Sequence, residues 1–413
     1  MPPSDSTRES SRQHCDLATL PLSGLRVLDF THVIAGPFAT MMLAHMGADV
    51  VKIERTGGEP LRHIPGFKGR DGHSDYFNAV NVSKKSIALN LKDPVDQSLV
   101  QDLVKQADVV IENFAPGTAD RLKLGWEDFK KINPNLVYCS ISGYGQTGPD
   151  SKKPATDPMI QGVSGLMSVT GVSDGPPTLV GAPVADVTAG MCAAYTIVTN
   201  LLAIEKGGPG RYIDISMQAA MMFAMGPRMA ETLQAGVVPP RMGNQNFIRV
   251  PSDVCISKDG KYAFVHCSND SRWQAMCRIM EKPEWAEDER YETMESRLAL
   301  RAELNRLVGE RFAERTLEEW RPRFEAEKHP FMQIHDYAEA IDHPQIKHRE
   351  QIVELEHDAD GPIRFIGPPW KITGHQPKIE SPPLYDADKD TVMGEWLGWS
   401  DDQIKAYQAK AKS

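Results

Sequence analysis

The stretch LRVLDFTHVIAGPFATMMLAHMGADVVKIER, residues 25–55, decides the fold class. Its first run, LRVLDF at 25–30, and its last run, DVVKIE at 49–54, are short, apolar and rich in β-branched residues, which is typical of strands buried on both faces of a parallel sheet. The segment 37–47 begins with Pro37, which a first helical turn tolerates, and ends at Gly47, so we expect a helix there. Strand, helix and strand in this order indicate a Rossmann-like α/β domain.

The same alternation continues to about residue 220. Further strands are expected at 86–91, 108–114, 136–142 and 211–217. Residues 93–107 place their apolar side chains on one helical stripe. Residues 181–205 predict a long helix of small and apolar residues, which Gly207 and Gly208 end. The Met-rich segment that follows at 217–233 is expected to be a linker helix packed in the core, because methionine fills irregular gaps.

The pattern of residues along the chain changes after residue 220, which predicts a second domain. The segment 253–268 is expected to form a hairpin around Asp259 and Gly260, followed by two charged helices at 272–282 and 297–327. The proline-rich tail is expected to be extended as far as a last helix in WSDDQIKAYQAKA. We therefore predict a disordered extension at 1–20, a large Rossmann-like domain at 21–220 completed by 335–413, and a small α+β domain at 225–330.

Composition argues against several kinds of partner. A net charge of −10 argues mildly against nucleic acid, since a phosphate backbone requires a basic surface. The six cysteines include no C-x-x-C pair, which disfavours a disulfide framework or structural zinc and favours a reducing cytoplasm. Residues 1–20 lack the apolar core of a secretory signal, and no apolar run approaches the roughly 18–20 residues of a membrane span. We expect a cytoplasmic protein without a membrane or nucleic-acid partner.

The segment GYGQTG at 143–148 matches the glycine pattern of dinucleotide-binding turns. That pattern should open a helix, whereas Pro149, a polar run and Pro154 follow, so we expect a loop. The sequence also lacks a G-x-x-x-x-G-K-[ST] phosphate loop, an H-E-x-x-H zinc motif and a G-x-S-x-G nucleophile elbow. The NTPase, zinc-protease and serine-hydrolase interpretations therefore fail.

Two features remain that carry chemistry. Polar residues stand at or just after the ends of predicted strands, where open α/β sheets place ligands, namely Arg55, Asn90, Lys92, Asn113 and then Arg121. Each alone fits a solvated surface, whereas several together suit an anionic ligand that bears phosphates.

Asp186 stands in the otherwise uncharged stretch 175–204, where an acid costs solvation free energy unless it is capped or used. Residue type alone favours a helix N-cap there.

The motifs of residues 25–55, SIALNLK, VVIENFAPGTADRLKLGW, NPNLVYCSISGYGQTGP and GAPVADVTAGM, in this order, resemble the family III CoA-transferases. This group contains formyl-CoA transferase and the CaiB/BaiF acyl-CoA transferases, and the resemblance covers roughly residues 21–400. It implies a large Rossmann-like CoA-binding domain and a small domain joined by long linkers. It also implies that two protomers thread through each other as an intertwined homodimer.

The resemblance implies that Asp186 is the catalytic nucleophile and is acylated by an acyl-CoA donor. An aspartyl anhydride and then an aspartyl-CoA thioester would carry CoA to a free carboxylic acid. No metal and no permanently bound cofactor is expected, since coenzyme A and acyl-CoA are substrates. The N-terminus of the following helix is expected to lower the pKa of Asp186. By similarity, the residues that contact CoA are Ile34, Ala35, Arg55, Leu89, Asn90, Leu91, Lys92, Asn113, Phe114, Ala115 and Arg121.

Departures from the family pattern bear on the substrate. Ile34 stands where formyl-CoA transferase has glutamine, and the chain lacks that enzyme's run of glycines in the small domain, so a larger acid is expected. A second carboxylate of a dicarboxylic acid would meet residues of the loop at 241–249, although a plain surface loop fits this segment about equally well. The residues concerned are Arg241, Asn244, Asn246 and Arg249.

Other functions stay open at this point. A relative with the same fold, α-methylacyl-CoA racemase, has a histidine where this chain has Thr156, and threonine is no general base near neutral pH. This difference favours transfer over racemisation. An isomerase that shifts CoA within one dicarboxylic acid, a non-catalytic CoA-binding protein and an NAD-dependent dehydrogenase are the alternatives.

Overall fold

The computed structural model describes residues 20–64, 74–358 and 361–411, so nearly all of the extension predicted at 1–20 lies outside the described residues. The chain divides into two compact units. The larger unit comprises the residues up to Ser164, Val180–Met229 and the residues from His348 onward, and the smaller unit comprises Gly165–Leu179 and Ala230–Lys347. Residues 165–179 and 335–347, which the sequence placed in the large domain, thus group with the smaller unit.

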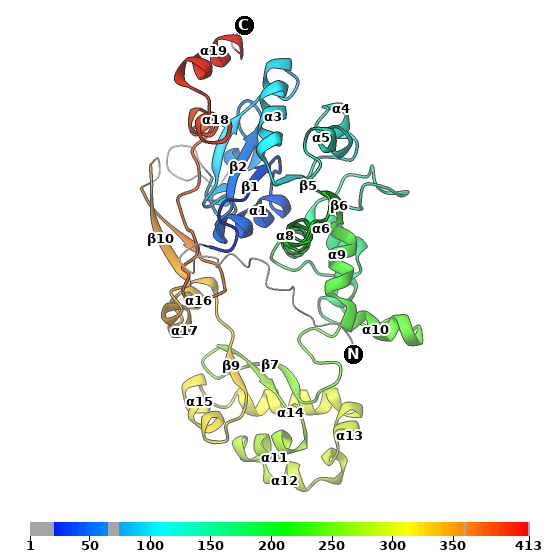
Figure 1. Cartoon of the computed structure of the whole chain (residues 1–413). Helices are drawn as coiled ribbons and strands as arrows, with labels where there is room; N and C mark the ends of the chain where they lie inside the picture. The colour runs from blue at the N-terminus through cyan, green and yellow to red at the C-terminus, as the bar shows by residue number, and fades with distance from the viewer. Residues whose placement is uncertain (1–19, 65–73, 359–360, 412–413) are drawn as a thin grey trace, which may run out of the picture. The chain divides into compact units, whose positions relative to one another are not determined.

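The larger unit is built on one parallel sheet of six strands in the order β3-β2-β1-β4-β5-β6 (Figure 1). The strands are β1 (Arg26–Asp29), β2 (Asp49–Glu54), β3 (Lys85–Ala88), β4 (Val109–Glu112), β5 (Val137–Ser142) and β6 (Arg211–Ser216). All neighbouring pairs are parallel, which confirms the α/β class expected from the sequence. The direction of winding reverses between β1 and β4, the place where such sheets bind ligands beyond their carboxyl ends.

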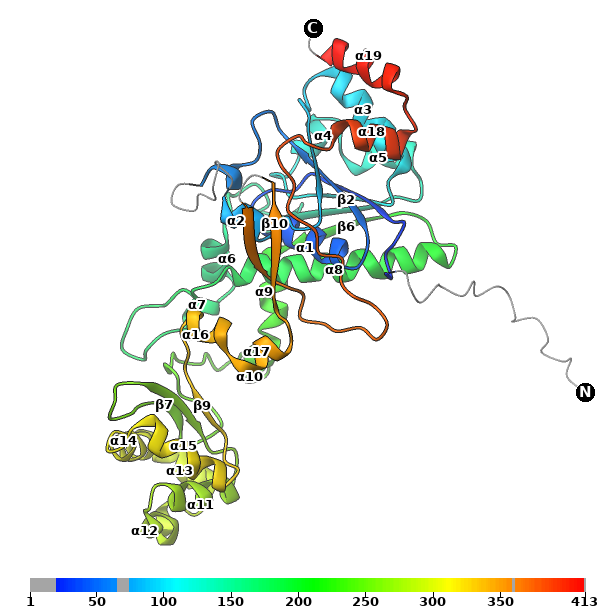
Figure 2. The same cartoon turned by 90° about the vertical axis from the view of Figure 1, so that its left-hand side faces the viewer.

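Helices cover both faces of this sheet (Figure 2). One face carries α1 (Ala35–His45) and α8 (Val184–Glu205), and the other carries α3 (Pro94–Gln106), α5 (Trp126–Ile132), α18 (Lys389–Leu397) and α19 (Asp401–Ala411). The helix α3 begins at Pro94, and the N-cap Asp93 accepts the N–H of Val95 at 2.7 Å. Its apolar stripe packs into one buried cluster with α18, α19 and the sheet.

Shorter elements connect these layers. In the larger unit they are η1 (Pro60–His63), α2 (Asp75–Asn78), α4 (Thr118–Arg121), α6 (Asp157–Val163), α9 (Met217–Ala224) and the start of α10 (Gly226–Ala235). The Met-rich segment therefore forms two helices. Its predicted place in the core holds only for one face of α9, where Met217, Ala220 and Met221 are buried, because Phe223 is 82% exposed and α10 has no buried residue.

The helix α8 runs along α1, and glycine makes the contact possible. A Cβ atom on Gly190 would lie 2.6 Å from the carbonyl oxygen of Ala35, closer than any real Cβ contact. By length and composition, α8 is the one helix among the described residues that is long and apolar enough to cross a membrane, contrary to the sequence expectation. Its first turn buries an aspartate, and one face of the helix packs on α1 and the sheet.

The smaller unit has its own core. The predicted hairpin is confirmed as β7 (Ser252–Ile256) and β8 (Tyr262–His266), and β9 (Phe331–Gln333) adds an unforeseen third strand. The predicted helix at 297–327 is wrong as a single element, because three helices span it, and the last starts at a capping box of Thr316 and Glu319. The helices are α11 (Asp270–Ile279), α12 (Pro283–Glu287), η3 (Glu289–Tyr291), α13 (Met294–Ala299), α14 (Arg301–Phe312) and α15 (Leu317–Ala326), with α7 (Leu166–Val169), α16 (Tyr337–Asp342) and α17 (Pro344–His348) in the connecting segments.

The tail departs from its prediction in one respect. The helix α18 forms where an extended chain was expected, and the extended segments β10 (Ile352–His357) and β11 (Gly361–Ile366) pair as an unforeseen antiparallel hairpin. The last helix, α19, is confirmed. It is tied to α3, where the hydroxyl of Tyr407 donates to Asp96 at 2.5 Å.

Candidate active site

Asp186 is the third residue of α8, inside its first turn, and its side chain is only 9% exposed. Pro183 occupies the N-cap position, so the N-cap interpretation of Asp186 is wrong. Among the described residues, no side chain or backbone group forms a hydrogen bond or ion pair with its carboxylate. A buried acid without a partner is uncommon in folded proteins, which makes this residue a candidate for chemistry.

A side chain from α6 caps the helix that carries Asp186. The Oδ2 atom of Asp157 accepts the backbone N–H groups of Ala185 at 2.7 Å and Asp186 at 3.1 Å. Its other oxygen accepts the amide of Gln161 at 2.6 Å, and Gln161 in turn accepts the N–H of Val180. The start of α8 is thus fixed by a helix nearly thirty residues earlier in the chain. No motif in the sequence marked Asp157, so this role was missed at the level of the sequence.

The pKa of Asp186 is raised to about 7, first by burial and then by the charge of Asp157. The sequence predicted the opposite direction from the helix N-terminus. The physical reason for the difference is that Asp157 already takes the free N–H groups of the first turn, so the favourable helix dipole is outweighed by desolvation. At neutral pH both protonation states of Asp186 are populated, and its ionised form is a poorly solvated carboxylate.

The start of α1 lies beside this turn. Asp186 precedes Gly190 by one helical turn on the same face of α8, and Gly190 packs against Ala35. Ile34, the N-cap residue of α1, forms a buried apolar cluster with Leu61 and Phe77, against which Tyr76 packs. The pKa of Tyr76 is raised by burial and then by the charges of Asp186 and Asp157, which puts its phenol in the same neighbourhood. The predicted residue Ala35 therefore packs on α8 one turn from Asp186, and Ile34 directly precedes it. Tyr76 was missed because no motif marked it.

The other predicted CoA contacts follow the carboxyl ends of the strands and differ in exposure. Arg55, Lys92 and Arg121 are exposed cations; the Arg55 Nε atom donates to the carbonyl of Gly58 at 2.9 Å and Arg121 donates to the hydroxyl of Thr118 at 2.7 Å. The remaining positions comprise one buried residue, Leu89, two exposed residues, Asn90 and Ala115, and two half-buried residues, Leu91 and Phe114.

Asn113 is engaged within the protein. Its side-chain oxygen accepts the N–H of His32 at 2.9 Å and its amide donates to the carbonyl of His32 at 2.8 Å. The ring of Phe114 stacks on His32 with centroids 6.1 Å apart. Burial and the charge of Lys52 lower the pKa of His32 to about 4, so this imidazole is neutral at physiological pH. Asn113 thus supports the loop between β1 and α1.

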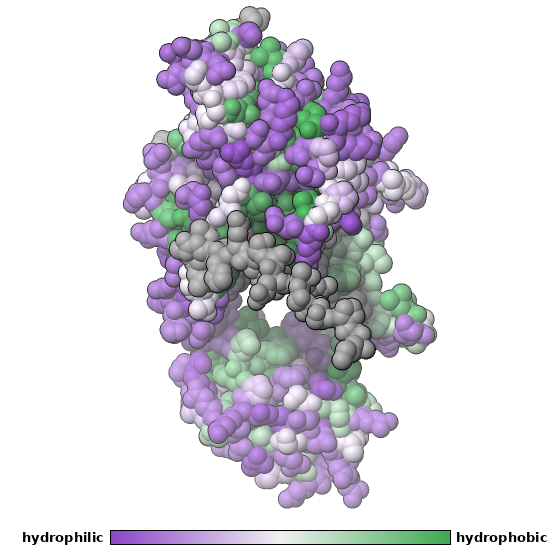
Figure 3. All heavy atoms as spheres, in the orientation of Figure 1, coloured by the Kyte–Doolittle hydropathy of each residue, from purple (hydrophilic) through white to green (hydrophobic). Residues whose placement is uncertain are grey.

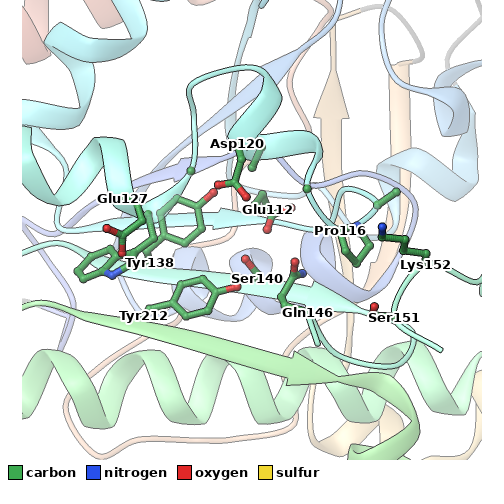
Figure 4. Close-up of a pocket in the computed structure, with 15 residues that line it drawn as sticks. Glu112, Pro116, Asp120, Glu127, Tyr138, Ser140, Gln146, Ser151, Lys152 and Tyr212 are labelled. Atoms are coloured by element: carbon green, nitrogen blue, oxygen red, sulfur yellow. The ribbon is translucent and has the colours of Figure 1, made fainter. Parts of the chain in front are cut away.

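A separate cavity of about 450 Å³ is lined by residues of α4, α5 and the strands β4, β5 and β6 (Figure 4). Glu112 and Asp120 line it, with the hydroxyl of Tyr212 directed toward Ser140 (Figure 4). Burial raises the pKa of Glu112 to about 7. Of the predicted CoA contacts only Ala115 lines this cavity, and its acidic walls do not suit the phosphates of CoA.

The remaining sequence hypotheses concern two loops. No helix forms between Ser142 and Asp157, all described residues, so the dinucleotide pattern at 143–148 lacks the element it requires. The loop at 241–249 belongs to the smaller unit, and there the guanidinium of Arg241 donates to the carbonyl of Gly175 at 2.7 Å. Asn246 accepts the N–H of Ile248 at 2.9 Å, so part of this loop is used to hold its own backbone.

Comparison with known proteins adds an independent result. The sequence matches the model of CoA-transferase family III over residues 22–389. It is 35% identical over 387 residues to the succinyl-CoA:glutarate CoA-transferase of Homo sapiens, covering 93% of this chain and 88% of that protein. It is 36% identical over 364 residues to the acetyl-CoA:oxalate CoA-transferase of Acetobacter aceti, covering 88% and 92%. The solved structure of a CAIB/BAIF family protein from Brucella suis is similar with a TM-score of 0.83 at 31% identity, covering 92% of this chain and 100% of that one.

Proposed function

Since the chain belongs to CoA-transferase family III and is a CoA-transferase, we propose that it moves CoA from an acyl-CoA donor to a free dicarboxylic or larger carboxylic acid, with Asp186 as the covalent carrier. The observation that carries this proposal is the state of Asp186, which is buried, lacks a bonding partner among the described residues and has a pKa near neutrality. A structural aspartate in such a place would only cost stability.

The first half of the reaction loads CoA onto the protein. An oxygen of the ionised Asp186 attacks the thioester carbonyl carbon of the donor, the carbon–sulfur bond breaks, and CoA leaves as a thiolate. The product is a mixed anhydride between Asp186 and the donor acyl group. The thiolate then attacks the Asp186 carbonyl of this anhydride, so that an aspartyl-CoA thioester forms and the donor acid leaves as a carboxylate.

The second half runs the same bonds in reverse with a new acid. The acceptor carboxylate attacks the aspartyl thioester, which releases the thiolate and forms a second anhydride. The thiolate attacks the acceptor carbonyl, which yields the new acyl-CoA and regenerates the Asp186 carboxylate. No proton is consumed in the exchange. Water must be kept from both activated intermediates, and the buried position of Asp186 supports this requirement.

We place CoA along the carboxyl ends of β1, β2, β3 and β4. The exposed cations Arg55, Lys92 and Arg121 suit its phosphates, because the first two follow β2 and β3 and the third ends α4. No ion pair links any of them to another residue that the structure describes. The thioester end would reach Ile34 and Ala35 at the start of α1, which adjoins α8. Leu89–Lys92, Asn113, Phe114 and Ala115 complete the proposed contact set.

The acid is proposed to be a dicarboxylate, by analogy with the relatives that act on glutarate and oxalate. The apolar cluster of Ile34, Leu61 and Phe77 beside Asp186 suits an acid with methylene carbons between its carboxylates. Transfer is favoured over racemisation because Thr156 offers no base, and the carboxylate of its neighbour Asp157 is occupied by two backbone N–H groups and Gln161.

The active enzyme is proposed to be an intertwined homodimer with long linkers. Support comes from α8, whose residues Met191, Tyr195, Val198 and Leu202 form an exposed apolar stripe at helical spacing. The larger unit carries further exposed apolar surface on α9, where Phe223 is 82% exposed. Figure 3 shows hydrophobic surface in the region where Figure 1 draws this helix. A second copy of this chain, carrying the same stripe, is the occupant that a two-fold contact requires.

We further propose a reducing cytoplasmic location. The five cysteines among the described residues are all free thiols, and four of them are buried. Burial raises the pKa of the Cys192 thiol, the half-buried one, so it is not activated for oxidation.

The proposal is tested by trapping the acyl-enzyme. The purified protein is incubated with succinyl-CoA, acetyl-CoA or oxalyl-CoA in the presence of hydroxylamine, and the peptide that contains Asp186 is analysed by mass spectrometry. We expect a hydroxamate on Asp186 and, with a panel of acids, new acyl-CoA products. Asp186→Asn should lose both, whereas Asp174→Asn, at an exposed position of the smaller unit, should lose neither. An unmodified Asp186 peptide during active turnover would exclude the covalent route.

A further inference from the structure

The loop between β1 and α1 is held almost entirely by side chains from elsewhere. Each backbone polar group from the N–H of Thr31 to the N–H of Val33 bonds a buried or half-buried side chain rather than the backbone. The bonds are Thr31 N–H to Asp29 Oδ1 at 2.9 Å, Lys52 Nζ to the Thr31 carbonyl at 2.8 Å, His32 N–H to Asn113 Oδ1 at 2.9 Å, Asn113 Nδ2 to the His32 carbonyl at 2.8 Å, and Val33 N–H to Glu59 Oε2 at 3.0 Å.

Val33 is held in an unfavourable conformation. Its φ is 66°, in the left-handed region that a β-branched residue rarely adopts. The side chain is 38% exposed, so burial of its methyl groups does little to offset the strain. Strained residues of this kind persist only where the surroundings fix them, and they cluster at functional sites.

The group that fixes Val33 belongs to a buried ionic network. Glu59 is buried, and its second oxygen lies 3.5 Å from the ammonium of Lys52, which is fully buried. The backbone N–H of Glu59 donates to Glu54 at 3.1 Å, and Glu54 pairs with Arg62 at 2.7 Å. Buried ion pairs contribute little net stability compared with apolar packing, so their specific geometry is the better explanation for their presence here.

The strained residue directly precedes Ile34, the N-cap of α1, whose first turn packs on α8 one turn from Asp186. A Cβ atom on Gly36 would lie 2.2 Å from Thr31 Cγ2, so the loop packs tightly on the first turn of α1. Ala35 in that turn contacts Gly190 of α8, one turn from Asp186. A rotation at Val33 would therefore move the start of α1 relative to the carboxylate.

We infer that Glu59 is a positioning residue for CoA transfer: by accepting the Val33 N–H while paired with Lys52, it locks the left-handed loop that sets Ile34 and Ala35 against Asp186. The inference rests on the proposed function, because its consequence is the alignment of a thioester with Asp186. Glu59 is absent from the proposed CoA contacts, and its effect is exerted through the backbone. Loss of the hydrogen bond between Val33 and Glu59 should lower kcat, while the Kd for CoA should change little.

The test uses a second-site rescue. Glu59→Ala should lower kcat about tenfold or more, and the Kd for CoA, measured by calorimetry, should change less than about threefold. Glu59→Gln keeps an oxygen for the Val33 N–H and should retain most of the turnover. Adding Val33→Gly to Glu59→Ala should restore much of kcat, because glycine adopts a positive φ without strain. The ratio of acyl-CoA hydrolysis to transfer should rise in Glu59→Ala and fall again in the double variant.

A matched control separates positioning from general stability. Lys123 also has a positive φ, 59°, in the turn between α4 and α5. Lys123→Gly should stabilise the Glu59→Ala protein without restoring its kcat. If Glu59→Ala does not fold, Glu59→Asp replaces it, since the shorter carboxylate keeps a charge near Lys52 but withdraws from Val33.

The outcomes are distinct for the two proposals. Full kcat in a folded Glu59→Ala protein, or equal rescue by Val33→Gly and Lys123→Gly, would overturn the role of Glu59. Loss of kcat that only Val33→Gly restores would support it. Failure of the proposed function would instead appear in the parent protein, as absence of CoA transfer with every donor or as unchanged turnover in Asp186→Asn.

Discussion

The carboxylate of Asp157 accepts the backbone N–H of Asp186 at 3.1 Å, so one acid holds the helical turn that carries the other. The arrangement has two consequences. It consumes the N–H groups of α8 that would otherwise stabilise a negative charge on Asp186, and it adds a like charge nearby. The proposed nucleophile is therefore more basic than an ordinary aspartate. A more basic carboxylate attacks a thioester better but must first lose its proton.

The first prediction concerns the pH dependence of transfer. In the parent protein kcat should rise with pH through about 7, as Asp186 ionises. Asp157→Asn removes the neighbouring charge, so the pKa of Asp186 should fall and the rising limb should move to lower pH, with a lower plateau because the helix cap is weakened. Profiles of kcat against pH for both proteins measure this shift. An unchanged midpoint in a folded Asp157→Asn protein would contradict the electrostatic coupling.

The second prediction concerns stability. The pKa of Asp186 is raised from its ordinary 3.8 to about 7 on folding, so the folded state holds this proton more tightly than the unfolded state does. The free energy of unfolding should therefore fall as pH rises from about 4 to about 7, and the cost should persist above that range. Asp186→Asn removes the ionisation. We expect it to be more stable than the parent by roughly 2–4 kcal/mol near pH 8 and about equal near pH 4.

Urea unfolding of both proteins at the two pH values measures the difference. Asp174→Asn serves as the exposed control and should show no such pH-dependent gain. Equal free energies of unfolding for the parent and Asp186→Asn near pH 8 would mean that burial does not raise the pKa of Asp186.

The six strands of the large sheet could be predicted because each is a short apolar run, and tertiary structure and local pattern agree there. The segment 108–114 illustrates this, since β4 occupies its centre and is buried throughout. The hairpin at β7 and β8 could also be predicted, from Asp259 and Gly260 in its turn. The hairpin of β10 and β11 could not, because prolines and charges mask the alternation of its side chains.

The site was predicted less completely than the fold, and the missing parts are long-range. Asp186 stood out as the one charge in its stretch, but its capping partner Asp157 is far away in sequence, so the direction of the pKa shift could not be inferred. The contact of Asn113 with His32 joins two loops separated by 81 residues. The Glu59–Val33 bond has no local signal, because nothing in the sequence marks a valine for a positive φ.

The third prediction tests the contact between α1 and α8. Gly190→Ala would place a methyl group 2.6 Å from the carbonyl oxygen of Ala35, so the helices must separate. We expect a loss of about 1–3 kcal/mol in the free energy of unfolding and a lower kcat, because Asp186 moves with α8. Gly394→Ala in α18 is the matched control, since a Cβ there meets nothing within 4 Å.

In that open position alanine should stabilise the helix by roughly 0.5–1 kcal/mol and leave kcat unchanged. Chemical denaturation and transfer assays on the two variants give both quantities. A Gly190→Ala protein that matches Gly394→Ala in stability and turnover would show that the close approach of α8 to α1 has no role in the site.

The fourth prediction tests the proposed homodimer through the apolar stripe of α8. Tyr195 is 71% exposed, and Leu202 lies two turns further along the same face. A double variant, Tyr195→Glu with Leu202→Glu, places two charges where a second copy would bury this face, so the dimer should dissociate or fail to form. Light scattering coupled to size exclusion measures the mass. Ile366→Glu is the control, because Ile366 in β11 is 73% exposed and its substitution makes one such apolar-to-charged change outside α8. If Ile366→Glu weakens the dimer as much as the double variant does, or if neither does, the stripe on α8 is not the surface that joins the two copies.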